Sequence, residues 1–257
     1  SNTPPPSALE AVRRARRAGN KASLCSGRNY GMLSPLLRYG FDGVISSAGG
    51  CIRYGDEPIY DCPMTPEQQA RAMGAFARAG VFRTAEGFWK TYTDEGFQDF
   101  LREKDGENSE LLRWRRQIEQ NLGIRPMAEY RGEPIYKILF ATPDAERLKK
   151  PREELEADFQ FCMQAPGRWG MANGELINRK FHKGTAVRRL CEYLGVPLEN
   201  TVAFGDSMND LEMLETAALG ICMGNGDEEL KRAAQAVCPP VGEDGLFRAF
   251  AEYGLMK

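Results

Sequence analysis

The sequence predicts an α/β protein in which a parallel sheet is interrupted by an inserted segment of strands and helices. Near the end of the chain, short apolar segments alternate with helical patterns, which is the spacing of a parallel sheet. The same alternation opens the chain, stops at Met64 and resumes near Lys180. We therefore expect a discontinuous core, residues 1–63 and 179–257, and an inserted α+β domain, residues 64–178.

The composition is that of a soluble globular protein, and its balanced charge favours a small ligand by default. Of the 257 residues, 42% are hydrophobic and 27% are charged, which suffices for one large core or two unequal ones. The net charge of −2 gives no electrostatic reason to expect nucleic acid or an anionic membrane as a partner. Seven cysteines without a C-x-x-C pair favour reduced thiols, and no apolar run has the length of a membrane helix. We expect a cytoplasmic protein.

The core elements follow from periodicity and from turn residues. Residues 7–18 place apolar side chains on one helical face, with Ser7 as the expected N-cap. Residues 51–62 predict a hairpin that turns at Gly55. The other core elements expected are strands 21–25, 42–47, 201–206, 219–224 and 235–240, a helical segment through Leu37, and a helix over 183–194.

The inserted domain opens with a capped helix. Thr65, Pro66 and Gln68 form a capping box with proline at the first helical position, and the helix should run to about Ala79. The other elements expected are helices 94–103, 108–122 and 144–155, and strands 81–84, 135–141, 159–163 and 171–178.

Two chain crossings would join this insert to the core, so we expect a mobile lid that sets substrate specificity. Residues 88–92 and the turn 168–173, which includes Trp169, are candidate substrate contacts. The alternative for any one of them is a place in the interior or on the surface of the insert.

Polar residues follow the apolar strand 201–206. In GDSMND, Asp206, Asn209 and Asp210 come directly after that strand. Ligands of open α/β sheets bind beyond the carboxyl ends of the strands, and carboxylate oxygen suits a hard divalent cation. Asp206 is therefore a candidate metal ligand. The alternative is that Asp206 or Ser207 only caps the helix that follows.

Two further segments carry candidates for phosphate binding. Ser26 and Gly27 stand between a strand and a helical pattern, where a hydroxyl and free amides can hold an anion, unless they form only a turn. Lys183 opens a helix, where a cation is disfavoured by the helix dipole, and this mismatch favours a bound anion nearby. The alternative is a solvated surface lysine. We interpret His182, the sole histidine, as an exposed neighbour and not as a general base.

Together these motifs resemble the haloacid dehalogenase superfamily, and in particular the Cof-type phosphatases with a large type IIB cap. LCSGRN resembles the second motif of that family, FHKGTAVRRLCEYLGV the third and GDSMND the fourth. FDGVISSAGG and GICMGNGDEELKRAA resemble the segments that follow the second and fourth motifs. The resemblance spans nearly the whole chain, and it implies a Rossmann-like parallel sheet core with an inserted α+β cap domain.

The resemblance also implies roles for single residues. Ser26 would hydrogen-bond the transferring phosphoryl group, and Lys183 would neutralise the charge of phosphate and nucleophile. Asp206 would hold Mg²⁺, Asn209 would reach the substrate phosphate or a metal-bound water, and Asp210 would orient Lys183. The candidate catalytic residues are thus Ser26, Lys183, Asp206 and Asp210, and the candidate substrate-binding residues are Ser26, Gly27, Lys183 and Asn209.

One motif of the family is absent. The first motif is Asp-x-Asp, in which the first aspartate attacks phosphorus and the second acts as acid and base. None of the twelve aspartates of this chain stands in D-x-D spacing. Either the first strand and nucleophile loop are missing from these 257 residues, or the natural protein has lost them. The presence of Ser26, Lys183, Asp206 and Asn209 together favours the former. A second departure is Ala48, where the family often has Asn.

The implied function is Mg²⁺-dependent hydrolysis of a small phosphorylated metabolite, such as a sugar phosphate or a cofactor phosphate, through an aspartyl-phosphate intermediate. The alternative is a non-catalytic phosphate-ligand binding or regulatory protein on the same fold. The presence or absence of the nucleophile distinguishes these two functions.

Without a D-x-D pair, the chain of 257 residues should not turn over a generic phosphomonoester such as p-nitrophenyl phosphate, even with Mg²⁺ present. The absent strand would also leave a sheet edge uncovered, so this chain should be poorly soluble by itself. Steady-state release of inorganic phosphate checks the first point. Robust, Mg²⁺-dependent release would mean that another residue acts as the nucleophile.

Overall fold

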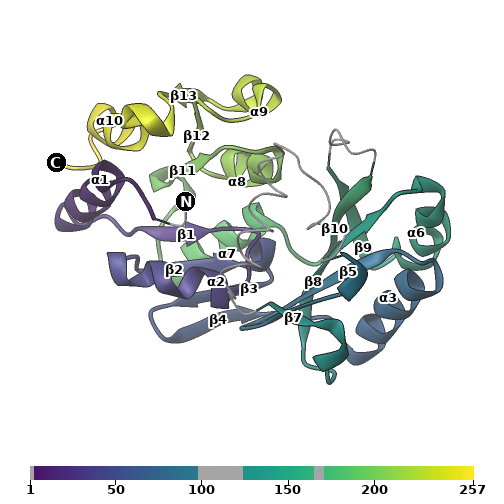
Figure 1. Ribbon diagram of the computed structural model, residues 1–257. Coiled ribbons are helices and arrows are strands. Elements are labelled where there is room, and N and C mark those ends of the chain that lie inside the picture. Colours follow the sequence, from purple (N-terminus) through teal and green to yellow (C-terminus); the bar gives the residue numbers. More distant parts are fainter. Residues whose placement is uncertain (1–2, 98–123, 165–170) are drawn as a thin grey trace. The chain divides into compact units, whose positions relative to one another are not determined.

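The computed structural model describes residues 3–97, 124–164 and 171–257, and the chain divides into two compact units. Unit 1 comprises Ser1–Arg28, Leu33–Asp61 and Phe181–Lys257, and unit 2 comprises Asn29–Met32 and Cys62–Lys180 (Figure 1). Because the short piece 29–32 belongs to unit 2, the chain crosses between the units four times, where the sequence predicted two crossings. That the two units act as catalytic core and cap stays a prediction.

Unit 1 contains two sheets. The first joins β1 (Ser23–Cys25), β2 (Gly43–Ser46), β3 (Cys51–Tyr54) and β4 (Glu57–Asp61) in that order, with β1 parallel to β2 and the other pairs antiparallel. The second joins β11 (Val202–Gly205), β12 (Leu219–Met223) and β13 (Ala236–Cys238), all parallel. Within the described residues, β1 and β11 are therefore edge strands of different sheets.

The helices of unit 1 cover these sheets and enclose apolar clusters, two of which contact β1. They are α1 (Pro6–Arg17), α7 (Lys183–Leu194), α8 (Leu211–Thr216), α9 (Glu228–Ala233) and α10 (Gly245–Glu252), while α2 (Tyr30–Leu33) spans a unit boundary. Short 3-10 turns cover Ser34–Tyr39, Ser47–Gly49, Leu198–Asn200, Met208–Asp210 and Val241–Glu243. One cluster packs Leu214 of α8 against Ala203 of β11, and the other packs Ala186 of α7 against Ile45 of β2. Cys25 contacts both clusters, so the end of β1 is held between them.

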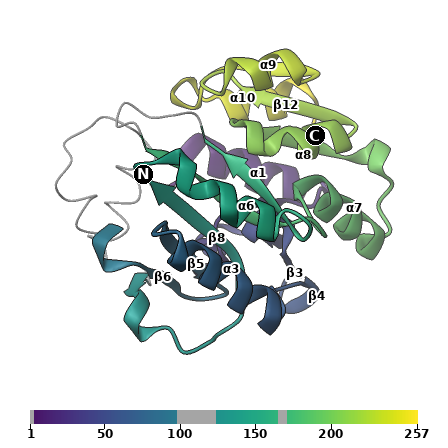
Figure 2. The same cartoon turned by 90° about the vertical axis from the view of Figure 1, so that its right-hand side faces the viewer.

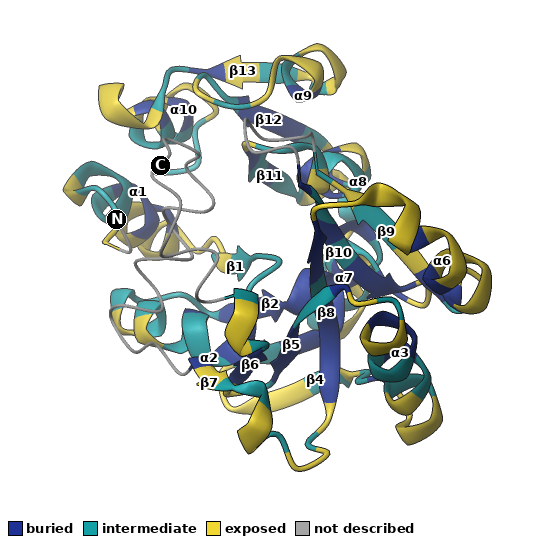
Figure 3. Cartoon of the chain, turned by 45° about the vertical axis from the view of Figure 1, so that its right-hand side comes forward, coloured by how far each residue is buried: buried dark blue, intermediate teal, exposed yellow. Residues whose placement is uncertain are grey.

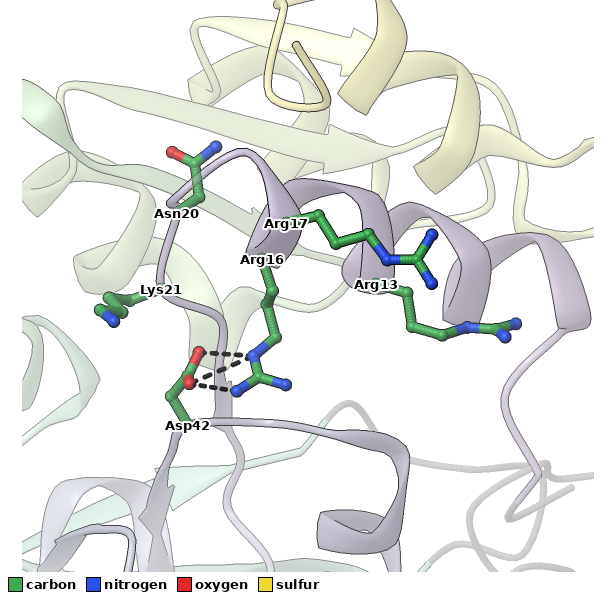
Figure 4. Close-up of a pocket in the computed structure, with 6 residues that line it drawn as sticks. All are labelled: Arg13, Arg16, Arg17, Asn20, Lys21 and Asp42. Carbon is green, nitrogen blue, oxygen red and sulfur yellow. Dashed lines mark hydrogen bonds and ion pairs between the residues drawn. The ribbon is translucent and has the colours of Figure 1, made fainter.

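An ion pair fixes α1 to the amino-terminal end of the first sheet. The Arg16 guanidinium donates to both carboxylate oxygens of Asp42, with an Nη2–Oδ1 distance of 2.7 Å, and Asp42 also accepts from the Ala22 amide at 2.8 Å. A hollow of about 320 Å³ opens here, lined by Arg13, Arg16, Arg17, Asn20, Lys21 and Asp42 (Figure 4). Basic residues in the last turn of α1 also match its helix dipole.

Unit 2 is a six-stranded sheet with helices on one face (Figure 2). Its strand order is β7 (Ile124–Pro126), β6 (Thr91–Thr93), β5 (Phe82–Gly87), β8 (Ile135–Thr142), β10 (Ala172–Asn178) and β9 (Phe159–Met163). Helices α3 (Pro66–Arg78) and α6 (Lys149–Leu155) bring Phe76 and Leu155 into one cluster with Ile138 and Phe140 of β8. This cluster is the core of unit 2.

The other face of this sheet is polar yet buried. Strand β8 is buried along nearly its whole length (Figure 3). Glu86 of β5 lies opposite Lys137 of β8 in the strand register, and Glu175 of β10 completes a charged group. The Lys137 Nζ lies 2.8 Å from Glu175 Oε1 and 3.4 Å from Glu86 Oε2. Burial alone would lower the pKa of Lys137, but the two carboxylates outweigh burial and raise that pKa. Lys137 is therefore a buried, positively charged side chain that two carboxylates hold in place.

Several expected elements are confirmed and others need correction. The Thr65–Gln68 capping box and the hairpin turning at Gly55 are present. The Ser7 N-cap is wrong, because α1 already begins at Pro6 after Pro5. The short strands β6 and β7 were missed, since three residues carry too little periodicity to identify a strand. Helices 94–103 and 108–122 and the turn around Trp169 lie mostly or wholly outside the described residues.

Among the helices described, none is long and apolar enough to cross a membrane.

The turn after β2 has no room for a side chain at Gly49. Its φ is +107°, and a Cβ there would lie 2.7 Å from the His182 carbonyl oxygen. Gly19 has a similar φ of +93° but open space around it. We expect Gly49→Ala to lower the free energy of unfolding by about 3 kcal/mol, and Gly19→Ala by about 1 kcal/mol, because only the former adds a clash to the backbone strain. Urea unfolding checks this. Equal losses of unfolding free energy in the two variants would show that the His182 backbone moves aside without cost.

Candidate active site

The loop that follows β11 is organised by the Asp210 carboxylate. Asp210 Oδ2 accepts hydrogen bonds from the backbone amides of Asp206 at 3.0 Å and Ser207 at 3.3 Å. Gly205 is required beside it, since a Cβ at that position would lie 2.6 Å from the Asp210 Cβ. The sequence GDSMND therefore folds back on its own last residue. This leaves Asp206 and Asn209 exposed at the carboxyl end of the strand.

Lys183 is buried against this loop. It is the first residue of α7, and only 4% of its side chain is exposed. Its Nζ donates to Asp210 Oδ1 at 2.6 Å and to Asn209 Oδ1 at 2.7 Å. Gly184 permits this approach of α7 to α8, because a Cβ there would lie 2.4 Å from the Glu212 carbonyl oxygen. The alternative of a solvated surface lysine is thus wrong.

The position of Lys183 at a helix start has a different explanation from the one that the sequence suggested. A cation there is disfavoured by the helix dipole, and we expected a bound anion to compensate. In the structure the compensating anion is the Asp210 carboxylate. The mismatch by itself therefore gives no support for a bound phosphate.

Asn209 keeps a donor that can face a ligand. Its Oδ1 accepts from both Lys183 Nζ and, at 2.8 Å, Ser207 Oγ. Both bonds use the amide oxygen, so the Nδ2 group is left as a hydrogen-bond donor on an exposed residue. Such a donor can bind a phosphate oxygen.

Ser26 follows β1 and lies in a tight turn. Its amide donates to the Ile45 carbonyl at 2.9 Å, and its carbonyl accepts from the Ala48 amide at 3.1 Å. Its Oγ accepts from the Arg28 amide at 3.2 Å, which is the turn geometry of the simpler alternative. That bond uses one lone pair and leaves the hydroxyl proton for another acceptor.

Cys25, the residue before Ser26, has a thiol that is close enough to Lys183 to be affected by its charge. Burial raises the pKa of the Cys25 thiol to about 12, with the charges of Lys183 and Asp210 acting on it in opposite directions. The thiol is therefore protonated at neutral pH and is a poor nucleophile.

His182 is not the exposed neighbour that the sequence suggested. It is half-buried and is the N-cap of α7, with Nδ1 accepting from the Thr185 amide at 3.4 Å and Thr185 Oγ1 accepting from the His182 amide at 3.0 Å. This capping box sets the start of α7 and with it the position of Lys183. Sequence reasoning missed it because histidine is uncommon as an N-cap.

Asp227 is a second residue that the sequence did not single out for the site. Its Oδ2 accepts from the Met208 amide at 3.0 Å, and its own amide donates to the Asp206 carbonyl at 2.9 Å. Asp227 therefore holds the loop through a carbonyl and an amide that Asp210 does not bond. The only sequence signal was its place in the segment GICMGNGDEELKRAA.

Comparison with known proteins agrees with the motifs. A family model described as haloacid dehalogenase-like hydrolase matches residues 1–250. The chain belongs to this family. YkrA of Bacillus subtilis (strain 168) is 28% identical over 98% of this chain and 92% of YkrA. The 5-amino-6-(5-phospho-D-ribitylamino)uracil phosphatase YwtE of the same organism is 26% identical over 92% of this chain and 87% of YwtE.

Solved structures of the family share the fold. A haloacid dehalogenase subclass IIB sugar phosphatase matches with a TM-score of 0.74 at 23% identity, over 98% of this chain and 92% of that one. A haloacid dehalogenase-like hydrolase from B. subtilis matches with a TM-score of 0.77 at 24% identity, over 96% and 92%. The expected α/β fold class is confirmed.

The donor chemistry of this haloacid dehalogenase-like chain fits Mg²⁺. The described residues hold no group of three or more His, Cys, Asp or Glu side chains that could cage a metal ion. Mg²⁺ does not require one, because it keeps several waters and takes one or two carboxylates together with phosphate oxygens. The exposed carboxylate of Asp206 is such a ligand.

Ala48, the second departure from the family pattern, has a left-handed backbone with φ of 58°. Asn adopts this conformation more readily than Ala. The family's Asn is therefore accounted for by backbone conformation as well as by any polar contact.

Asp210→Asn should destabilise this protein strongly. The substitution leaves the buried Lys183 charge without a counter-ion and removes an acceptor from the loop, so we expect a loss of about 3 kcal/mol in the free energy of unfolding at pH 7. Glu228→Gln breaks the Lys231–Glu228 pair, in which Glu228 is 77% exposed, and should cost below about 1 kcal/mol. Urea unfolding of both variants makes the comparison, and a small loss for Asp210→Asn would contradict the structural role of the buried pair.

Proposed function

We propose that the haloacid dehalogenase-like fold of this chain serves the hydrolysis of a small-molecule phosphomonoester, with Mg²⁺ as cofactor. The observation that carries the proposal is the buried Lys183, held by Asp210 and Asn209 at the carboxyl end of β11. A fixed cation beside hydrogen-bond donors is what a transferring phosphoryl group requires, since its catalysis is mostly positioning and charge stabilisation. The names of relatives support sugar phosphates and cofactor phosphates as the substrate class.

Each candidate residue has a role that its chemistry supports. Lys183 supplies positive charge to the phosphoryl oxygens, and Asp210 holds the Lys183 ammonium in place. Ser26 donates its hydroxyl proton to a phosphoryl oxygen, helped by the backbone of Gly27, and Asn209 donates through its side-chain amide. None of these groups is a nucleophile, so the proposed reaction takes its nucleophile from a D-x-D segment, whose first aspartate forms the aspartyl-phosphate.

Asp206 is the proposed metal ligand. The Asp206 carboxylate would hold Mg²⁺, which would supply positive charge to the phosphoryl group. The backbone of Asp206 is held by the bond from its own amide to Asp210 and by the bond from the Asp227 amide to its carbonyl.

A second candidate function is supported by one observation, the absence of D-x-D spacing from all 257 residues. A chain with Ser26, Lys183 and Asn209 but without a nucleophile binds phosphate and does not cleave an ester. This is a phosphate-ligand binding or regulatory protein on the same fold. Both candidates predict phosphate binding, and only the first predicts turnover once a D-x-D segment is present.

The test uses the chain preceded by a first strand and D-x-D loop taken from a relative, assayed against sugar phosphates and cofactor phosphates. Asp206→Asn should abolish Mg²⁺-dependent turnover, because it removes the charge that holds the metal while keeping the shape. Lys183→Ala should lower kcat for every substrate alike, by at least about a hundredfold, since it acts on the shared phosphoryl group.

Asp56→Asn is the matched control, because Asp56 is an exposed carboxylate in the hairpin turn between β3 and β4. It should leave turnover and metal affinity unchanged. Unaltered turnover and Mg²⁺ affinity in Asp206→Asn would reject the assignment of that residue. If the protein with a D-x-D segment binds inorganic phosphate but cleaves no ester, the second candidate function replaces the first.

A further inference from the structure

Asp227 occupies the N-cap position of α9, but its side chain is used elsewhere. The helix covers Glu228–Ala233 and takes no side-chain hydrogen bond from Asp227. The Asp227 carboxylate instead accepts from the Met208 amide at 3.0 Å, in a loop that lies 19 positions earlier in the sequence. An N-cap aspartate that bonds its own helix typically contributes about 1 kcal/mol to stability. Because α9 lacks that bond, the carboxylate serves the loop after β11 and not its own helix.

The Asp206 backbone is bonded on both sides by residues of two different elements. Its amide donates to Asp210 Oδ2 at 3.0 Å, and its carbonyl accepts from the Asp227 amide at 2.9 Å. Asp210 ends the turn that precedes α8, whereas Asp227 immediately precedes α9. With both neighbouring peptide groups bonded, the direction in which the Asp206 side chain leaves the backbone is set.

Two carboxylates together accept from three consecutive amides of this loop. Asp210 accepts from the amides of Asp206 and Ser207. Asp227 accepts from the next amide, that of Met208. The bond from Met208 therefore continues a series that Asp210 begins, and without it the loop would be held by Asp210 alone on its amide side.

Helix α9 gives Asp227 a fixed support within unit 1. Leu230 of α9 is 0% exposed and packs in the same apolar cluster as Leu214 of α8. Gly226 allows the close approach of this segment to the loop, because a Cβ there would lie 2.8 Å from the Asp206 carbonyl oxygen. The brace by Asp227 is therefore built on a packed helix.

We propose that Asp227 is a positioning residue, which fixes the backbone of Asp206 and thereby sets the affinity of the site for Mg²⁺. A ligand group that is already ordered binds more tightly than one that must be ordered on binding. Loss of the Met208 bond would free one side of the loop, and metal binding would then have to order it. The metal part of this inference rests on the proposed function, whereas the ordering of the loop does not.

The test uses the chain preceded by a first strand and D-x-D loop, and it compares Asp227→Ala with Asp227→Asn. Asparagine keeps an oxygen that can accept from the Met208 amide and removes only the charge. The first readout is hydrogen exchange without metal at the amides of Asp206 and Ser207, whose hydrogen bonds go to Asp210. Asp227→Ala should speed their exchange about tenfold, and Asp227→Asn should leave it near that of the unsubstituted protein.

Glu229→Ala is the matched control for charge, because Glu229 is an exposed carboxylate in the first turn of α9. It removes the same charge as Asp227→Ala and should leave exchange at Asp206 and Ser207 unchanged. The amide of Ile221, a buried residue of β12, reports whether each variant is folded.

Gly226→Ala tests the same brace without removing a carboxylate. Its methyl must push the segment away from the Asp206 carbonyl, so it should speed exchange in the loop as Asp227→Ala does. Gly242→Ala is its control, since a Cβ at Gly242 meets nothing within 4 Å. If Asp227→Ala does not fold, Gly226→Ala takes its place.

Mg²⁺ affinity, measured by calorimetry without substrate, is the second readout. Asp227→Ala and Gly226→Ala should raise the dissociation constant of Mg²⁺ about tenfold, and Asp227→Asn should keep the value of the unsubstituted protein. In turnover, excess Mg²⁺ should bring kcat of Asp227→Ala back to within about twofold, whereas no Mg²⁺ concentration should restore Lys183→Ala. This difference separates the positioning of a metal ligand from the loss of charge at the phosphoryl group.

Faster exchange at Met208 alone, with Asp206 and Ser207 unchanged, would overturn the positioning role. An unchanged Mg²⁺ affinity in Asp227→Ala would do the same if Asp206→Asn weakens that affinity. If Asp206→Asn itself leaves Mg²⁺ affinity unchanged, the metal assignment of the proposed function fails. Exchange at Asp206 and Ser207 then still decides whether Asp227 orders the loop.

Discussion

The Asp210 carboxylate is the interaction on which the candidate site depends. One oxygen holds the Lys183 ammonium, and the other closes the loop through the amides of Asp206 and Ser207. A buried carboxylate is costly unless it is paired with a cation and hydrogen-bonded, and here a cation and two backbone donors contact it. Because Lys183 opens α7 and Asp210 precedes α8, the same pair joins two helices. The charge that would meet a phosphate is therefore fixed by the packing of unit 1.

Sequence patterns predicted those parts of the molecule in which the information is local. The Thr65–Gln68 capping box, the hairpin around Gly55 and α7 follow from residues a few positions apart. Contact between Lys183 and Asp210 could be expected only through the family resemblance, because 27 positions separate them. The capping role of His182 was missed although its partner Thr185 is only three positions away, because histidine is uncommon as an N-cap. The bracing by Asp227 had no local signal, since it depends on where two segments meet.

The largest departures from expectation arise where long-range packing outweighs local pattern. Residues 29–32 fall within the expected core segment 1–63, yet they belong to unit 2, where the Tyr30 ring stacks on Phe88. Lys137 stands in the middle of an apolar strand pattern, and its charge is compensated by Glu86 and Glu175 from the two neighbouring strands. The sequence of β8 alone does not reveal that Glu86 and Glu175 compensate this charge, since cross-strand partners depend on register. Buried charges of this kind seldom add stability, so stability alone does not account for them.

The described residues of the candidate site offer charge and hydrogen-bond donors, and none of them has the surroundings of an activated nucleophile. Its groups are a buried ammonium, side-chain amide and hydroxyl donors and an exposed carboxylate. Cys25 is the nucleophilic side chain nearest in sequence to Ser26, and burial keeps its thiol protonated by raising its pKa to about 12. A hydroxyl such as that of Ser26 needs a neighbouring base, and the sole histidine uses its Nδ1 to cap α7. The two candidate functions therefore share every described residue of the site, and they differ only in whether an aspartate pair is brought to it.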